Sequence, residues 1–346
     1  MDFTILKHLN AKISEIAYKF NWKLVPAYPE GVMVEPASVC NLKCVLCPIS
    51  KEGAISRKNK FIKLKQFKKT FRIARLFIKY ITFWNYGEPL LNKDLSQMIN
   101  FVARFGVNTQ VSTNGLVFDH DNIEKILKSG LSKLIISVDT YDSREYAKYR
   151  RGGNFDLLER NIKKILYIKS RVKTNTSIAL QFIISRHNQE EVNKIKSFFK
   201  KFNADELIIK TIGVGSAFIR PSDQELYFLP TNNFLRYNPK TLTVKDKSNL
   251  RCKYVWKRMV ICSDGAILPC CRDQVGKFTL GNAFRGSLLM QFNTYKYLKF
   301  RKEILDIQKN EIMCLRCSED IKKKIEPGSV CLSQSQYNKN FDFKLK

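Results

Sequence analysis

Short hydrophobic runs alternate with amphipathic segments between residues 31 and 215. The runs are rich in β-branched and aromatic residues, which is typical of short strands buried in a parallel sheet. They are 31-GVMVEPA-37, 80-YITFWNY-86, 108-NTQVSTN-114, 133-KLIISVDT-140, 177-SIALQFII-184 and 206-ELIIKTIGV-214. This alternation predicts six β/α units.

The intervening segments carry apolar residues at helical spacing. In 61–80, Leu64, Phe67 and Phe71 share one face, and lysines and arginines occupy the other. The same pattern predicts helices over 94–105, 121–130, 154–169 and 188–202. Asn154 and Asn188 stand where N-caps belong, and Gly106 and Gly130 stand where helices end.

Strands joined by helices imply right-handed crossovers and a parallel sheet. Six units are too few to close an eight-stranded barrel, so the α/β fold is either a curved partial (β/α)6 barrel or an open sheet. In both cases we expect the functional site at the C-terminal ends of the strands.

The remaining segments suggest five parts. We expect an N-terminal extension (1–30), the β/α domain (31–215), a polar connector (216–250), a small C-terminal domain (251–320) and a polar tail (321–346). In the C-terminal domain, two apolar runs flank Ser263, Asp264 and Gly265, which predicts a β-hairpin followed by helical segments.

Charge and composition narrow the classes of function. Lys and Arg number 61 against 31 Asp and Glu, a net charge of +30, which favours anionic partners. The lysines are scattered, so we expect a small anionic molecule rather than nucleic acid. No signal peptide or membrane-spanning run is present, which predicts a cytoplasmic protein without membrane association. Ten cysteines in such a chain favour metal ligands over disulfides.

Three cysteines, Cys40, Cys44 and Cys47, follow the first predicted strand in the stretch 40-CNLKCVLC-47. A structural zinc site needs four ligands, and none of the three histidines lies nearby. A four-iron cluster held by three thiolates fits better, because its fourth iron can bind a small molecule that carries an amine and a carboxylate.

This C-x3-C-x2-C loop after the first strand of a six-unit β/α domain resembles the radical SAM superfamily. The resemblance extends over about residues 31–320 and implies a partial barrel. It implies that Cys40, Cys44 and Cys47 hold a [4Fe-4S] cluster and take part in catalysis, and that S-adenosylmethionine binds the open iron. It also implies an electron donor such as a flavodoxin or ferredoxin.

Further motifs match the family's cofactor-binding positions. The stretch 86-YGEPLL-91 resembles a Gly-Gly-Glu-Pro turn, with Gly87, Glu88 and Pro89 in place and Tyr86 instead of the first glycine. The resemblance implies that these residues, with Asn114 and Ser137, contact S-adenosylmethionine. Arg150 matches the arginine that binds its carboxylate. Asn114 and Asp139 can equally be turn residues, Arg151 is an alternative to Arg150, and we expect His187 at the surface.

The C-terminal cysteines resemble the SPASM module in its shortened form, called twitch. Cys252, Gly265 and Cys270 have the module's initial spacing, and 314-CLRC-317 adds a pair. The resemblance implies one auxiliary [4Fe-4S] cluster on Cys252, Cys270, Cys314 and Cys317. Zinc on the same thiols is the alternative. Cys271 competes with Cys270, whereas we expect Cys262 to be buried and Cys331 to be a free thiol.

The resemblance implies that an electron from the first cluster cleaves S-adenosylmethionine to a 5′-deoxyadenosyl radical, which removes a hydrogen atom from a substrate carbon. The auxiliary cluster either accepts a second electron, shapes the pocket or relays electrons. We expect an oxidoreductase acting on a small polar metabolite, such as a sugar or cyclitol, and the positive charge of the chain favours a phosphorylated one. A peptide or protein maturase is the second hypothesis. An RNA-binding zinc protein is the third.

Overall fold

The computed structural model describes residues 3–51, 53, 55–214, 218–245, 251–317 and 329–333 of the 346-residue chain. For residues 329–333 the description covers the backbone only.

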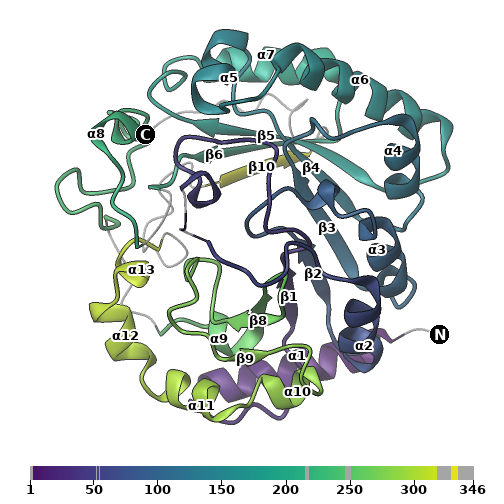
Figure 1. Cartoon of the computed structure of the whole chain (residues 1–346), viewed down its shortest axis with the longest axis vertical. Helices are drawn as coiled ribbons and strands as arrows, with labels where there is room; N and C mark the ends of the chain where they lie inside the picture. Colours follow the sequence, from purple (N-terminus) through teal and green to yellow (C-terminus); the bar gives the residue numbers. More distant parts are fainter. Residues whose placement is uncertain are drawn as a thin grey trace.

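Six parallel strands form the centre of the fold, as the hydrophobic runs predict. They are β1 (Gly31–Val34), β2 (Tyr80–Phe83), β3 (Asn108–Thr113), β4 (Lys133–Ser137), β5 (Ser177–Ile184) and β6 (Glu206–Thr211). Consecutive strands are neighbours throughout, with Gly31 opposite Tyr80 and Gln110 opposite Lys133. The strands curve around one side of the molecule in an open arc, which is the partial barrel of the prediction (Figure 1).

The sheet continues beyond these six strands. Its order is β10-β6-β5-β4-β3-β2-β1-β7-β8-β9. The added strands are β7 (Arg258–Ile261), β8 (Ala266–Leu268), β9 (Gly281–Asn282) and β10 (Ser329–Ser333). The predicted hairpin is β7–β8, and its first strand pairs in parallel with β1. The C-terminal hairpin therefore extends the barrel sheet, and β10 adds an antiparallel strand from a region expected to be a polar tail.

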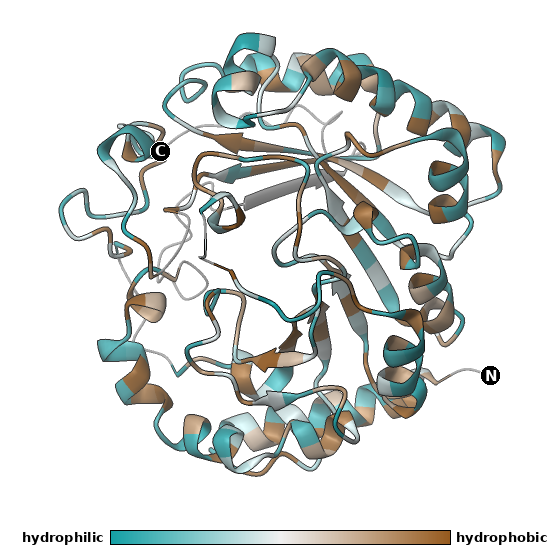
Figure 2. Cartoon of the chain, viewed as in Figure 1, coloured by the Kyte–Doolittle hydropathy of each residue, from teal (hydrophilic) through white to brown (hydrophobic). Residues whose placement is uncertain are grey.

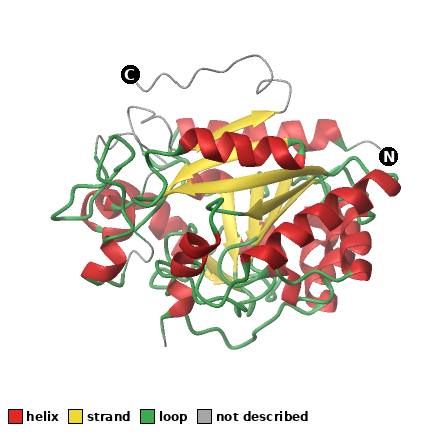
Figure 3. Ribbon diagram, turned by 90° about the horizontal axis from the view of Figure 1, so that it is seen from above, coloured by secondary structure: helices red, strands yellow, loops and turns green. Residues whose placement is uncertain are grey.

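Helices cover the outer side of the sheet (Figures 1 and 3). They are α2 (Leu64–Ala74), α3 (Leu95–Ala103), α4 (His120–Leu127), α5 (Ser143–Tyr149), α6 (Phe155–Arg171) and α7 (Val192–Phe202), with short 3₁₀ turns η1 (Pro48–Ser50) and η2 (Pro89–Leu91). Their inward residues, such as Phe67, Ile162 and Phe199, join one large core with the strands. Hydrophilic positions lie on their outer sides (Figure 2), as amphipathic periodicity requires.

One predicted helix cap is confirmed and the other is wrong. The Asn154 side chain accepts a hydrogen bond from the Leu157 amide and caps α6. Helix α7 begins only at Val192, after Glu191. The Asn188 amide group instead donates to the carbonyls of Asp139 and Ile183, and its oxygen accepts from the Ser185 amide, so the side chain serves the loop after β5 rather than a helix start.

The N-terminal and C-terminal helices close the arc together. They are α1 (Thr4–Lys19), α9 (Tyr254–Lys257), α10 (Leu288–Gln291), α11 (Tyr295–Lys302), α12 (Ile304–Asn310) and α13 (Ile312–Leu315). The short helix α8 (Asp223–Leu226) belongs to the connector. Helix α1 contacts α9, and the Trp256 indole donates to the Trp22 carbonyl. Arg301 is buried and donates to the Lys23, Val255 and Phe292 carbonyls.

The connector is better packed than its polar composition suggests. Phe228, Leu229 and Tyr237 are buried in a small hydrophobic cluster with Val45 and Leu46 of the cysteine loop. The connector therefore supports the loop that carries Cys44 and Cys47. Within the described part of the chain, no helix combines the length and apolar character that crossing a bilayer requires.

Candidate functional site

The three-cysteine loop lies at the C-terminal end of β1 and is held by the last residue of α5 and the segment that follows it. The Lys43 amide donates to the Arg151 carbonyl at 2.9 Å, and the Val45 amide donates to the Tyr149 carbonyl at 3.0 Å. These bonds fix the backbone on both sides of Cys44. The loop is therefore set by residues about 100 positions away rather than by its own turn chemistry.

The three thiols are partly or fully buried, and none forms a disulfide. Burial, together with the charges of neighbouring thiolates, raises the pKa of Cys40 to about 11 and that of Cys47 to about 12. Mutual repulsion of this kind is relieved by a cationic centre that binds all three sulfurs. The donor set therefore fits an iron–sulfur cluster.

Among the described residues, no group of three or more His, Cys, Asp or Glu side chains converges closely enough to hold a metal ion. Ligands to one zinc must converge at bonding distance on one centre, whereas ligands to different irons of a cluster stand further apart.

Gly87 adopts a conformation that only glycine accepts at this position. Its φ angle is +85°, and an added Cβ would lie 2.2 Å from the Ala37 carbonyl oxygen and 2.8 Å from that of Val39. The Glu88 amide also donates to the Val39 carbonyl. The turn after β2 is thus pressed against the chain that enters the cysteine loop.

Glu88 lies buried at the base of this turn. Its Oε1 accepts hydrogen bonds from the Thr113 hydroxyl at 2.7 Å and the Leu90 amide at 3.1 Å, and its Oε2 accepts from the Asn114 amide at 2.8 Å. Burial raises the pKa of Glu88, and these donors oppose the rise. Oε2 retains acceptor capacity for a further donor such as an amine. Pro89 follows as the first residue of η2.

Asn114 connects the end of β3 to the cysteine loop. Its side-chain amide donates to Asn41 at 2.8 Å and lies 3.8 Å from the Cys40 sulfur. Ser137 is buried at the end of β4, where its hydroxyl accepts from Gln181 at 3.4 Å. Both residues therefore lie at the C-terminal ends of the barrel strands. Asn114 contacts the three-cysteine loop, and Ser137 lies on the next strand, β4.

Arg150 points inward and Arg151 outward. The Arg150 guanidinium binds the Asp139 carboxylate, with Nε at 2.6 Å and Nη2 at 2.5 Å from Oδ2. Asp139 has a φ angle of +65° and is buried, so its turn conformation serves the ion pair. Arg150 also lowers the pKa of Cys44, which burial raises. Arg151 is exposed. The geometry favours Arg150 as the residue near the cofactor.

Tyr86, which replaces the first glycine of the turn, bridges to the C-terminal module. Its hydroxyl donates to the Cys271 carbonyl at 3.1 Å. Burial raises its pKa well above the usual range, and the Cys271 and Cys47 thiolates both add to the rise. The side chain therefore stands between the two groups of cysteines.

The second group of cysteines forms around the loop after β8. The thiolates of Cys271, Cys317 and Cys314 all raise the pKa of Cys270, after burial, so these sulfurs lie near one another. Cys252 and Cys314 also pack against the same core. The charge of Cys271 also acts on Tyr86, so this thiol lies near both Cys270 and Tyr86. The choice of Cys270 as the ligand stays a prediction from the spacing of the motif.

Cys262 and Asp273, which lie near these cysteines in sequence, have structural roles. Cys262 is buried against Val260, Leu268 and Met33, which confirms the expected packing role. Asp273 is buried, and its two oxygens accept from the amides of Lys277 and Phe278, so it closes a turn. The expectation for the Cys331 thiol lies outside the described residues, because only the backbone of β10 is described.

His187 is not the surface residue that its position before a polar segment suggested. Its Nδ1 lies 2.9 Å from Glu145 Oε2, and its ring packs on Tyr227 and Phe228. The helix that would have left it exposed begins several residues later, so the chain folds His187 back against the connector.

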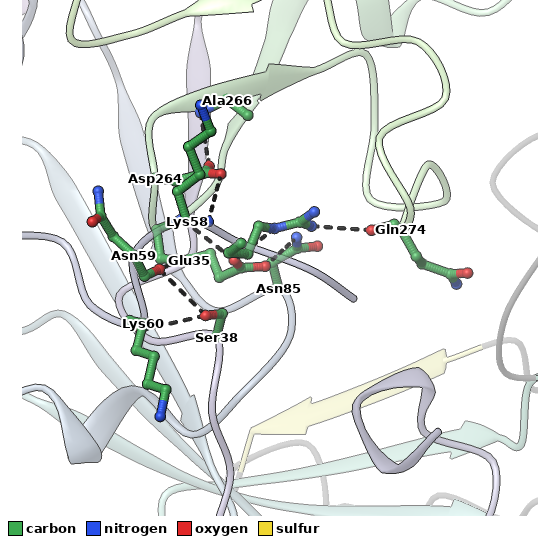
Figure 4. A network of polar contacts seen from close by, with 11 residues as sticks. Glu35, Ser38, Lys58, Asn59, Lys60, Asn85, Asp264, Ala266 and Gln274 are labelled. Carbon is green, nitrogen blue, oxygen red and sulfur yellow. Dashed lines mark hydrogen bonds and ion pairs between the residues drawn. The ribbon is translucent and has the colours of Figure 1, made fainter. Parts of the chain in front are cut away.

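A buried polar network joins the barrel to the C-terminal hairpin (Figure 4). Arg57 Nε donates to Glu35 at 3.2 Å, and Asn85 and the Ser263 amide also donate to this carboxylate. Arg57 Nη2 donates to the Gln274 carbonyl at 3.0 Å. The network places the segment after the cysteine loop beside the loop that carries Cys270.

Comparisons with known proteins agree with this arrangement. The model of the radical SAM superfamily matches residues 34–197, and the model of the SPASM iron–sulfur cluster-binding domain matches residues 252–318. The chain belongs to the radical SAM superfamily. It is a radical SAM enzyme with a C-terminal SPASM module, and its cofactors are S-adenosylmethionine and [4Fe-4S] clusters. The zinc alternative for the C-terminal thiols does not agree with this match.

Two curated relatives and one solved structure define the similarity further. A GTP 3′,8-cyclase of Clostridium botulinum strain Okra is 22% identical over 68% of this chain and 79% of its own length. A probable GTP 3′,8-cyclase of Saccharolobus islandicus is 23% identical over 91% of this chain and 97% of its own length. The crystal structure of Streptococcus suis SuiB has a TM-score of 0.63 at 15% identity, covering 90% of this chain and 81% of that chain. The structural likeness shows the fold.

Two features of this radical SAM enzyme's site are absent from the sequence prediction. They are the Tyr86 bridge to Cys271 and the Glu35–Arg57 pair. Tyr86 stood out only as a departure from the glycine pattern. Arg57 and Glu35 carry no motif, and their pairing depends on the fold.

Proposed function

We propose that this enzyme removes a hydrogen atom from a carbon of a small polar metabolite and completes a two-electron oxidation. When bound, the cluster and S-adenosylmethionine supply the 5′-deoxyadenosyl radical that this reaction needs. The observation that carries the proposal is the convergence of Cys40, Glu88 and Asn114 with the Arg150–Asp139 pair at one end of the barrel.

The chain's own residues have separate tasks in this proposal. Cys40, Cys44 and Cys47 hold the cluster, while Gly87 and Pro89 shape the turn against which the methionine part binds. Glu88 Oε2 accepts the amine through its spare acceptor capacity. Arg150 positions the carboxylate, and Asn114 and Ser137 donate to or accept from the nucleoside. Cys252, Cys270, Cys314 and Cys317 hold the auxiliary cluster.

A polar substrate is favoured by the lining of the barrel mouth. Ser137, Gln181 and Lys210 come two positions after Ile135, Ala179 and Ile208 in β4, β5 and β6, so they share the same face of the sheet, and Trp84 packs against that cluster. The two relatives are named for a reaction of GTP. A sugar, cyclitol or nucleotide-like metabolite is therefore our proposed substrate class.

The test is anaerobic reconstitution followed by iron, sulfide and 5′-deoxyadenosine measurements. We expect about eight irons in the wild type and about four in a Cys40/Cys44/Cys47→Ala variant, with 5′-deoxyadenosine formed only by the wild type. Candidate metabolites are then screened for a product two mass units lighter. Zinc in place of iron, or no 5′-deoxyadenosine under strong reductant, would refute the radical part of the proposal. If the product is a modified peptide rather than a small molecule, the enzyme is a peptide maturase and the proposed substrate class is wrong.

A further inference from the structure

Helix α1 turns its polar and small side chains toward the protein and its large apolar side chains toward solvent. Its buried residues are Lys7, Asn10, Ala11, Ser14 and Ala17. The exposed apolar residues in and just after the helix, here called the N-terminal apolar patch, are Ile5, Leu9, Ile16, Phe20, Trp22 and Leu24. A surface helix normally has the opposite arrangement, because burial of apolar area stabilises its packing.

The inward face of α1 is fixed by hydrogen bonds. Lys7 Nζ donates to the Phe105 carbonyl at 2.6 Å. The Asn10 side chain donates to the Tyr28 carbonyl and accepts from the Tyr28 amide, both at 2.9 Å. Rotation of the helix would break these bonds, so the apolar patch is held outward.

The apolar patch forms a ridge rather than scattered points. Ile5, Leu9, Ile16 and Phe20 are spaced by four, seven and four residues, which places them within about 60° of one another on a helix that turns by about 100° per residue. Ile5 is 74% exposed and Phe20 is 72% exposed. Seven of the fifteen large apolar residues that are exposed in the described chain fall between residues 5 and 24. Such a concentration marks an interaction surface.

The ridge lies at the end of the barrel opposite to the three-cysteine loop. Helix α1 is bonded to Phe105, which precedes β3, and to Tyr28, which precedes β1. It therefore crosses the N-terminal ends of these strands, along the lower edge of the molecule in Figure 1. The cysteine loop follows the C-terminal end of β1. A partner bound to the ridge would leave the barrel mouth open.

The border of the ridge is basic. The exposed cations around it are Lys12, Lys19, Lys23, Arg104 and Lys253. Glu15 is the one acidic residue between positions 3 and 24, and it pairs with Lys257. This hydrogen bond lowers the pKa of Glu15, and the charges of Lys19 and Lys253 lower it further, so both lysines lie near the helix. The surroundings of the ridge therefore match an anionic surface.

A second copy of this chain is a poorer match for the ridge than a lipid surface. A twofold contact through α1 would bring the lysines of the two copies toward each other, and like charges repel. At an anionic bilayer, lysines extend their charged ends to the headgroups while aromatic side chains such as Phe20 and Trp22 enter the interface.

We propose that the N-terminal apolar patch binds the surface of a bilayer that contains anionic lipids, with α1 lying in the plane of the interface. The ridge enters the boundary between headgroups and acyl chains, and Lys12 and Lys19 contact the headgroups. A helix that lies on a membrane needs no spanning run, so the lack of such a run, from which we expected no membrane association, does not exclude this mode of binding.

The experiment measures co-sedimentation of the anaerobically reconstituted enzyme with vesicles of equal parts phosphatidylglycerol and phosphatidylcholine. We expect the wild type to bind and Phe20→Ser to bind at least about tenfold more weakly, because a large apolar side chain no longer leaves water. Tyr167→Ser removes another exposed aromatic side chain, on α6, and should leave binding unchanged. Absence of binding by the wild type, or equal losses in the two variants, would overturn the proposal.

The basic border is tested by charge removal. Lys12→Gln/Lys19→Gln should weaken binding to these vesicles, and so should added salt. Lys163→Gln/Lys173→Gln removes two exposed lysines in and just after α6 and should have a much smaller effect. Equal weakening by the two pairs would show that the whole basic surface attracts the vesicles, which would overturn the assignment to the patch.

Sedimentation velocity without lipid tests the competing role in self-association. We expect a monomer, whereas a wild-type dimer that Phe20→Ser converts to a monomer would overturn the membrane assignment. The inference does not depend on the proposed reaction, since vesicle binding needs neither reductant nor S-adenosylmethionine cleavage. Phe20→Ser should form 5′-deoxyadenosine like the wild type in solution, because the ridge lies away from the barrel mouth. Failure of the radical chemistry and failure of membrane binding are therefore distinguishable.

Discussion

At the scale of single residues, two neighbours in the turn after β2, Tyr86 and Gly87, differ in how their side chains use the space around them. Gly87 has no side chain because carbonyl oxygens of Ala37 and Val39 occupy its space. Tyr86, one position earlier, fills its space and reaches the C-terminal module. The family motif has two glycines at these positions. In this chain only Gly87 keeps the close backbone contact, and Tyr86 instead forms a hydrogen bond to the C-terminal module.

Replacing Gly87 with Ala should abolish S-adenosylmethionine cleavage. A Cβ at 2.2 Å from a backbone oxygen forces the turn away from the cysteine loop, which separates Glu88 from its site. Unfolding measurements should also show a loss of about 1–2 kcal/mol from the positive φ angle alone.

The matched control is Gly106→Ala. Gly106 has a φ angle of +66°, but its nearest neighbour would be Lys7 Nζ at 3.5 Å. We expect a similar loss of stability with 5′-deoxyadenosine formation retained. Equal activity in the two variants would contradict the role assigned to the contact with Ala37.

At the scale of elements, the Glu35–Arg57 pair connects the end of β1 to the hairpin of β7 and β8. Both side chains are buried. Removing one member leaves the other charge without its partner, so Arg57→Met should lower the free energy of unfolding by about 3–5 kcal/mol.

The double variant Glu35→Gln/Arg57→Met should be less destabilised than Arg57→Met alone, because it leaves no uncompensated charge. Urea denaturation of the wild type, both single variants and the double variant gives the coupling energy. Additive losses would show that the two residues act independently.

The auxiliary ligand assignment also belongs to this scale, because it depends on one loop meeting another. Cys270→Ala and Cys317→Ala should each lower the iron content by about four per chain. Cys262→Ala, which removes a fully buried thiol within an apolar cluster, should leave the iron content unchanged. Loss of iron in Cys271→Ala with retention in Cys270→Ala would reverse the choice between these neighbours.

The sequence predicts the elements well where the signal is local. Six apolar runs identify the six parallel strands, and the three-cysteine loop and the Gly87–Pro89 turn identify their motifs. The Asn188 cap is wrong because an asparagine that suits a helix start equally suits the carbonyls of Asp139 and Ile183. The pairing of β7 with β1 and the approach of Tyr86 to Cys271 join residues far apart in sequence, so no local pattern predicts them.

At the scale of the whole molecule, Arg301 joins both ends of the described chain. Its Nη1 donates to the Lys23 carbonyl, a contact across 278 positions, while Nη2 and Nε hold the Phe292 and Val255 carbonyls. It thereby fixes the N-terminal segment against the C-terminal helices.

Arg301→Met should therefore destabilise the whole fold rather than one helix. Leaving several buried carbonyls without donors costs roughly 1–3 kcal/mol for each group that finds no water. We expect a single cooperative unfolding transition at lower temperature, followed by circular dichroism and by cluster absorbance together. Loss of cluster absorbance at a temperature where the helices persist would show that the module unfolds separately.

The position of β1 between β2 and β7 has a consequence for biosynthesis. One edge of β1 stays open on the ribosome until residues 258–261 have emerged, roughly 10–45 s after β1 itself at ordinary translation speeds. During that interval the Cys40–Cys47 loop exists without Gln274 and Cys271 beside it. We expect the Cys40–Cys47 loop to receive its iron–sulfur cluster before the loop that carries Cys270. Once the hairpin of β7 and β8 has been translated and has paired with β1, the first loop is less accessible.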